Sequence, residues 1–191
     1  MDNKVRVALI YGSTRKGRFC DKVAAWAAQE IRSHGGFSID AIDPAVDGLE
    51  PQFDAESRAG ASSLWQRVAE ADAFVIVTPE YNHGYPAPLK ELIDSVGAEW
   101  HAKPVAFVSY GGVSGGLRAV EQLRAVFTEL HAVTIRDSVS FAGAQQQFDD
   151  AGTLTEPERA ERSMARTLAR LRWWATTLNF ARATSPYPAT V

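Results

Sequence analysis

The chain has 191 residues, of which 46% are hydrophobic, and this length is typical of one domain with a sizeable core. The net charge of −3, without a basic tract, argues against nucleic acid as a partner, and no apolar run approaches the roughly 20 residues that span a bilayer. The start, Met1–Lys4, lacks a signal segment and Cys20 is the only cysteine, so we expect a cytoplasmic protein without a disulfide or a bound metal.

Five apolar segments of strand length alternate with longer segments of helical pattern. The first, third and fourth are continuously apolar, as strands covered on both faces are, whereas the second alternates like an edge strand. We predict strands over Val5–Tyr11, Phe37–Ile42, Ala73–Thr78, Val105–Tyr110 and Val133–Phe141. We predict helices over Phe19–Ser33, Arg58–Ala71, Ala87–Val96, Gly115–Leu130 and Glu156–Asn179.

This alternation predicts an α/β fold, a doubly wound parallel sheet of five strands with helices on both faces. Residues 1–180 would form a single domain, and residues 181–191, which contain Pro186 and Pro188, an irregular tail. Ligands of such sheets bind beyond the carboxyl ends of the strands, where the strand order reverses. With the order 2-1-3-4-5, the loops after the first, third and fourth strands would therefore form one cleft.

The loop after the first strand is made of small, hydroxyl and cationic residues, and a helix follows it. The backbone N–H groups at such a helix N-terminus favour an anion. Gly12 and Gly17 have the spacing of a Walker loop, but Arg18 and Phe19 stand where Lys and Ser or Thr should follow. Thr14 likewise replaces the second glycine of the dinucleotide fingerprint. The pattern favours a terminal phosphate monoester over a solvated surface turn.

The other two loops are suited to a flat ring. The loop over residues 78–88 is rich in proline, aromatic residues and glycine, so it is stiff and brings backbone groups close to a planar ligand. The loop over residues 109–116 has four glycines within Gly111–Gly116, which lets another molecule approach its backbone. Each loop alone is compatible with an ordinary turn, and a histidine such as His83 is more often a hydrogen-bonded loop residue than a catalyst. Together, the three loops predict a flavin mononucleotide (FMN) site.

Three motifs carry a resemblance to a known family: Gly12–Arg15, Pro79–Gly84 and Ser109–Gly116. The chain resembles the NADPH-dependent FMN reductases of the flavodoxin-like superfamily, a group that includes quinone, azo-dye and chromate reductases. The likeness extends to about Gly152. It implies a flavodoxin-like fold, bound FMN, NADPH or NADH as co-substrate, and a small acceptor such as free flavin, a quinone, an azo compound or a metal oxyanion.

The resemblance also implies a division of the site. Ser13, Arg15 and the segment 18–20 would hold the FMN phosphate, residues 79–83 would line the ring, and residues 109–112 would close its other edge. Where many relatives have Ser and Asn, this chain has Arg18 and Cys20, so Arg18 would either bind the phosphate or point toward the extra phosphate of NADPH. The candidate cofactor-binding residues are Ser13, Arg15, Arg18, Phe19, Cys20, Pro79, Glu80, Tyr81, Asn82, His83, Ser109, Tyr110, Gly111 and Gly112.

The chemistry would take place on FMN, so we expect no catalytic acid or base and a ping-pong exchange between NADPH and the acceptor. Three other functions are weighed against this one. A flavodoxin-like electron carrier is usually strongly acidic, whereas this chain has a charge of only −3. A flavin-binding regulatory module has no sequence feature in its favour. A phosphate-binding hydrolase lacks a nucleophile, because no C-x5-R signature surrounds Cys20.

The last predicted helix bears on oligomeric state. Its apolar stripe is typical of a side that faces the core. Trp173 and Trp174 lie off this stripe and suggest a second buried face. Together with the resemblance, they lead us to expect a homodimer or homotetramer. The stripe consists of Met164, Leu168, Leu171, Ala175 and Leu178.

Overall fold

Five parallel strands form one sheet in the computed structural model, which describes residues 4–46 and 64–188. Their order is β2-β1-β3-β4-β5, and each neighbouring pair is parallel, so the predicted flavodoxin-like fold and strand order are confirmed. Each predicted strand agrees with the structure to within one residue at either end. The strands are β1 (Val5–Tyr11), β2 (Phe37–Ile42), β3 (Ala73–Pro79), β4 (Pro104–Gly111) and β5 (Val133–Ala142).

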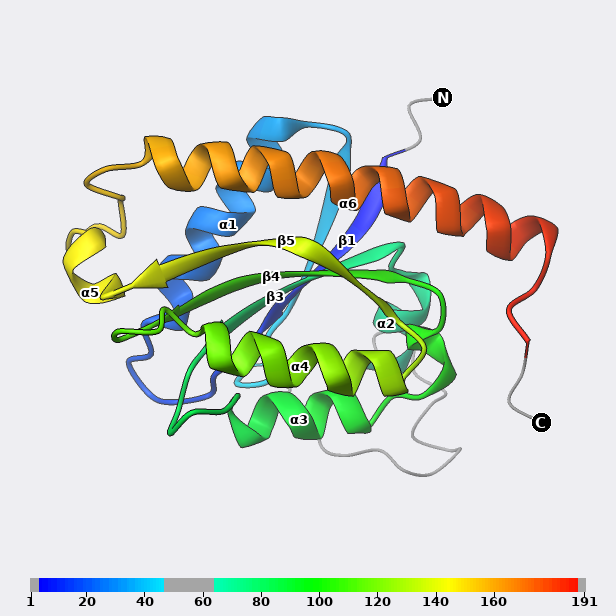
Figure 1. Cartoon of the computed structure of the whole chain (residues 1–191), viewed down its shortest axis with the longest axis horizontal. Coiled ribbons are helices and arrows are strands. Elements are labelled where there is room, and N and C mark those ends of the chain that lie inside the picture. Colours follow the sequence, from blue (N-terminus) through cyan, green and yellow to red (C-terminus); the bar gives the residue numbers. More distant parts are fainter. Residues whose placement is uncertain (1–3, 47–63, 189–191) are drawn as a thin grey trace.

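Helices cover both faces of the sheet (Figure 1). Two of them, α1 and α6, pack on one face, while α2, α3 and α4 pack on the other. No helix in the described part of the chain is long and apolar enough to cross a membrane. The helices are α1 (Cys20–His34), α2 (Leu64–Glu70), α3 (Ala87–Asp94), α4 (Leu117–Glu129), α5 (Ala144–Gln147) and α6 (Glu158–Thr184).

The buried strands divide their side chains between two cores. Along β1, Val7 and Leu9 face the core under α1 and α6, and Ala8 and Ile10 face the core under α2, α3 and α4. All seven residues of β3, the central strand, are buried. Strands enclosed in this way need apolar side chains on both faces, which explains why their sequence runs are continuous rather than alternating.

Three differences from the predicted elements have local causes. The predicted helix over Arg58–Ala71 begins outside the described residues, and α2 accounts for its second half. The one-turn helix α5 and a 3₁₀ turn at Ala98–Trp100 are too short to show periodicity. The segment expected to be irregular from residue 181 is helical as far as Thr184, because Pro186 disfavours helix only from Ser185 onward, whose ψ is 101°.

A buried lysine lies at the amino-terminal edge of the sheet, away from the predicted cleft. Lys103 Nζ donates to the carbonyls of Val68 and Ala69 at 2.8 and 2.7 Å, in the last turn of α2. Burial, and secondarily the charge of Arg182, lower the pKa of Lys103 from 10.5 to about 8. The folded protein therefore holds this proton less tightly than the unfolded chain does.

We expect Lys103→Met to change how stability depends on pH. Below pH 8 both states of the wild type are protonated, and the cost of burying the charge is fully present. Between about pH 8 and 10.5 the folded state loses the proton first, so the wild type gains up to about 1.4 kcal/mol per pH unit relative to the variant. Urea unfolding at several pH values measures this difference.

Lys90→Met is the matched control, because Lys90 is more exposed and pairs with Asp94 at 2.6 Å. The pKa of Lys90 is raised, not lowered, so the free energy of unfolding of the wild type relative to Lys90→Met should show no rise over the same pH range. A constant difference between the wild type and Lys103→Met would contradict the assignment.

Candidate cofactor site

A cleft of about 450 Å³ opens at the carboxyl ends of the strands, where β1 and β3 lead to helices on opposite faces of the sheet. This is the position at which doubly wound sheets bind ligands, and the volume lies within the roughly 300–1,000 Å³ of small-molecule sites. Loops that follow four strands line it. They contribute Arg15, Lys16, Gly17, Arg18 and Phe19 after β1, Pro79, Glu80 and Tyr81 after β3, Tyr110, Gly111 and Gly112 after β4, and Gly143, Ala144, Gln145 and Gln146 after β5.

The structure brings most of the predicted site residues together in this cleft. Those that line it are Arg15, Arg18, Phe19, Pro79, Glu80, Tyr81, Tyr110, Gly111 and Gly112. Those that lie outside its walls are Ser13, Cys20, Asn82, His83 and Ser109. Sequence reasoning missed the segment 143–146, although it follows the fifth strand and so had to emerge at the same edge of the sheet.

The loops after β1 and β3 are joined across the cleft by Tyr81. Its hydroxyl hydrogen-bonds the buried Ser13 Oγ at 2.8 Å. The Arg15 guanidinium lies over the Tyr81 ring, 3.6 Å from the ring centroid, which is a favourable cation–π geometry. One of the two exposed cations of the first loop, Arg15, is thereby placed on an aromatic residue of the second loop.

The amino-terminus of α1 lies next to the first loop. Phe19 occupies the N-cap position, and no side chain caps the helix there, which leaves the first backbone N–H groups for a bound anion. The Cys20 thiol is buried 3.8 Å from the Val77 carbonyl, and burial raises its pKa. Only the backbone of Cys20 is therefore suited to a ligand in the cleft.

Arg18 lines the cleft, and its side chain makes its hydrogen bonds with groups of the protein itself. Its side chain is only 8% exposed, and its guanidinium pairs with both carboxylate oxygens of Asp43. It also donates to Asp21 at 2.7 Å and to the Ser13 carbonyl. The positive charge of Arg18 is therefore paired with the carboxylates of Asp21 and Asp43.

Asn82 and His83 form a tight turn. Both have positive φ, 50° and 68°, while Tyr81 and Gly84 exchange two backbone hydrogen bonds of 2.9 and 3.1 Å. This is the pattern of a type I′ turn, in which asparagine is favoured. The turn leaves both side chains exposed, outside the cleft.

The carboxylate of Glu80 ties the second loop to the start of α4. It is 7% exposed and accepts from Ser114 Oγ, Arg118 Nε and the Arg118 backbone N–H at 2.6, 2.6 and 3.2 Å. Burial acts to raise the pKa of Glu80, but the Ser114 hydrogen bond and the Arg118 charge outweigh it, so the pKa lies below its ordinary value. A carboxylate at a helix N-terminus also gains from the helix dipole.

Arg118 extends this network to the turn, since its Nη1 donates to His83 Nε2 at 2.7 Å. A guanidinium only donates, so the facing nitrogen of His83 must accept. No motif marks Arg118 in the sequence, because it lies 38 residues from Glu80.

Aromatic rings and open backbone complete the cleft. The ring centroids of Phe19 and Tyr110 lie 5.8 Å apart. Burial raises the pKa of Tyr110, so its phenol stays protonated. In the part of the chain that the structure describes, nothing beyond its chain neighbours lies within 4 Å of where a Gly112 side chain would begin, which leaves the backbone open to a ligand. Gly116 has a φ of +84°, and a Cβ there would meet Ser109 Cβ at 2.8 Å, so only glycine lets this loop pack on β4.

Comparison with known proteins gives concordant results. Residues 5–146 match the family described as NADPH-dependent FMN reductase. An NAD(P)H-dependent FMN reductase of Schizosaccharomyces pombe is 35% identical over 120 residues, which cover 58% of this chain and 60% of that protein. An NAD(P)H:quinone oxidoreductase of Solanum tuberosum is 34% identical over 185 residues, 86% of this chain and 90% of that protein.

A solved structure agrees on the fold. The flavoenzyme NAD(P)H:(acceptor) oxidoreductase of Paracoccus denitrificans superposes with a TM-score of 0.68 at 22% identity, covering 90% of this chain and 98% of that one. The family match spans β1 to α5 and so includes all four loops of the cleft. The chain belongs to the NADPH-dependent FMN reductase family of flavodoxin-like oxidoreductases.

Proposed function

We propose that this protein binds FMN in the cleft and uses it to pass electrons from NADPH or NADH to a small acceptor. The observation that carries the proposal is the pairing of an uncapped α1 N-terminus with an aromatic and glycine-lined wall in one cleft of about 450 Å³. The first feature suits a phosphate and the second a flat ring. When bound, FMN supplies the hydride and electron-transfer chemistry, and the protein supplies position and electrostatics.

The residues divide between the two parts of the cofactor. The N–H groups at the start of α1 would hold the phosphate, with Arg15 as the cation of the loop. The backbone of Pro79–Tyr81 would line one edge of the ring, and Tyr110–Gly112 would close the other. The Glu80 network fixes the second loop relative to α4, so this backbone is held in place before the cofactor arrives.

The open side of the cleft would receive NADPH and the acceptor in turn, which gives ping-pong kinetics. Free flavin, a quinone, an azo compound and a metal oxyanion would all meet the same ring face. The buried free thiol of Cys20 is compatible with a reducing compartment, and we place the protein in the cytoplasm.

A visible absorption spectrum followed by anaerobic addition of NADPH tests the function. We expect the purified protein, or the protein after incubation with FMN, to show flavin bands that bleach on addition and return when a quinone is supplied. Bands that persist would instead indicate an electron carrier or a regulatory flavoprotein. A protein that takes up no FMN would contradict the proposed site.

We expect His83→Ala to lower turnover by less than about tenfold, since general acid–base catalysis typically contributes 10²–10⁴-fold. His83 is exposed, lies outside the cleft walls and accepts a hydrogen bond from Arg118. Gln122→Ala is the matched control, because Gln122 Nε2 donates to the His83 carbonyl at 2.8 Å and carries no titratable group. A loss of three orders of magnitude with FMN still bound, in His83→Ala alone, would assign a proton-transfer role to His83.

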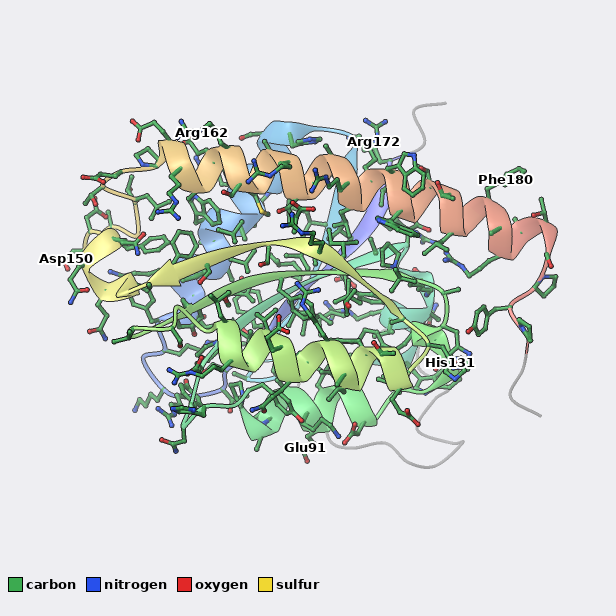
Figure 2. The ribbon with its side chains drawn as sticks, viewed as in Figure 1. Glu91, His131, Asp150, Arg162, Arg172 and Phe180 are labelled. Carbon is green, nitrogen blue, oxygen red and sulfur yellow. The ribbon has the colours of Figure 1, made fainter. Side chains whose placement is uncertain are left out.

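We also propose that the protein is a homodimer or homotetramer. The predicted stripe of α6 faces the core, with Met164, Leu168, Leu171 and Ala175 fully buried. Of the two tryptophans expected on a second face, Trp174 packs against the core and Trp173 is 60% exposed. Phe180, which is 71% exposed, lies seven residues after Trp173 and so shares its side of the helix. Figure 2 shows Phe180 on the side of α6 that faces away from the sheet.

Light scattering at micromolar concentration should give a mass at least twice that of the 20.8 kDa chain. Trp173→Glu should shift the equilibrium toward the monomer, because it places a charge in the shared apolar face. Val46→Glu, which charges another exposed apolar side chain, should leave the mass unchanged. A wild type that is monomeric at this concentration would contradict the proposal.

A further inference from the structure

We propose that Arg18 does not bind the cofactor phosphate but is a positioning residue that fastens the phosphate loop, residues 13–19, to the end of β2 through Asp43. The inference rests on the proposed FMN site and assigns a role to Arg18, which the sequence left between two alternatives. It also makes Asp43, an acidic residue, necessary for tight binding of an anionic cofactor.

The hydrogen bonds of Arg18 leave little of it for a ligand. A guanidinium has five N–H donors. Nε donates to Asp21 and Nη1 donates to both the Ser13 carbonyl and Asp43 Oδ1, while Nη2 donates to Asp43 Oδ2. Four bonds to three acceptor groups hold the side chain at 8% exposure. The planar fork fits the Asp43 carboxylate in the two-point geometry that lysine cannot reproduce.

These bonds act on the backbone of the phosphate loop. Arg18 binds the carbonyl of Ser13, five residues earlier, so it closes the loop on itself. In a trans peptide the carbonyl and the next N–H point in opposite directions, and fixing the Ser13 carbonyl therefore fixes the Thr14 N–H away from Arg18. An anion site made of backbone N–H groups depends on this kind of orientation.

Asp43 gives the loop a rigid anchor. Its side chain is 16% exposed and also accepts the Ala45 N–H at 3.0 Å. Burial acts to raise the pKa of Asp43, but the Arg18 hydrogen bond, the Ala45 N–H and the Arg18 charge together outweigh it, so the pKa lies below its ordinary value and the carboxylate stays charged. Asp43 directly follows the buried Ile42 of β2, which pairs with Ile10 of β1. The phosphate loop is thus attached to the sheet at two points: its chain continues from β1, and Arg18 pairs with Asp43 at the end of β2.

The charges around Arg18 and its role as a positioning residue predict opposite changes in FMN affinity when Asp43 is removed. Arg18 is paired with Asp43 and Asp21, so this group carries a net charge of −1 beside the phosphate loop. Removal of Asp43 would take away a negative charge and release Arg18. On electrostatic grounds alone, FMN would then bind more tightly. If Arg18 is a positioning residue, removal of Asp43 instead weakens FMN binding, because the phosphate loop is no longer fixed to the end of β2.

The experiment compares FMN with riboflavin, which has the same ring and no phosphate, by titrating the apoprotein and following flavin fluorescence. We expect Asp43→Ala and Arg18→Ala each to weaken FMN binding by at least about tenfold while riboflavin binding changes less than about twofold. The double variant should be no worse than either single variant, because both changes remove one interaction. Asp43→Asn, which keeps the shape of the side chain, should show a smaller loss in the same direction.

Asp40→Ala is the matched control. Asp40 lies on β2, which Asp43 directly follows, and its carboxylate is bound by Arg67 at 2.6 and 2.8 Å. The variant therefore removes the same charge and the same kind of ion pair away from the cleft. Its FMN affinity should equal that of the wild type. Thermal unfolding of each variant without flavin identifies any general loss of structure.

Two results would overturn the proposal while leaving the FMN site intact. One is unchanged or tighter FMN binding in Asp43→Ala and Asp43→Asn, with a loss only in Arg18→Ala, which would make Arg18 a direct phosphate ligand. The other is an equal loss of FMN and riboflavin binding, which would mean that the pair supports the fold generally. A wild-type apoprotein that binds neither flavin would overturn the proposed function and this inference with it.

Discussion

The site depends on the close approach of the first loop to the end of β3. Gly12 donates its N–H to the Val77 carbonyl at 2.8 Å, and a Cβ at Gly12 would lie 2.7 Å from that same oxygen. A residue with a side chain would force the two strand ends apart. Because they meet here, Ser13 reaches Tyr81 and Arg15 stacks on its ring, so the loops after β1 and β3 form one continuous surface.

The polar groups around the cleft are mostly paired with one another. Glu80 is held by Ser114 and Arg118, and Arg18 is held by Asp43 and Asp21. Pairs of this kind fix the positions of the loops, and with them the backbone that lines the cleft. Such a site suits a cofactor that carries its own chemistry, because the protein then needs to supply a rigid surface and no catalytic side chain.

Much of the fold could be predicted because buried parallel strands leave a strong signal. The continuous apolar runs of β1, β3 and β4 are required by helices on both faces, and the change to glycine, proline and hydroxyl residues marks the strand ends. Helix α6 extends to Thr184, beyond the predicted boundary of the tail at residue 181, because Pro186 restricts the backbone only from Ser185 onward. Helix α5 was missed because one turn shows no periodicity.

The amino-acid sequence by itself determined that the loops after β1, β3 and β4 share one cleft, since parallel strands in the order 2-1-3-4-5 must place those loops at one edge of the sheet. The fourth contribution, from the segment after β5, was found only in the structure. Only the tertiary structure decided what the charged side chains in those loops do. Arg18 meets a carboxylate 25 residues away, and Glu80 meets the N-terminus of a helix 38 residues away. A long side chain in a loop has several directions of similar energy, and the partner that selects one of them is supplied by another part of the fold.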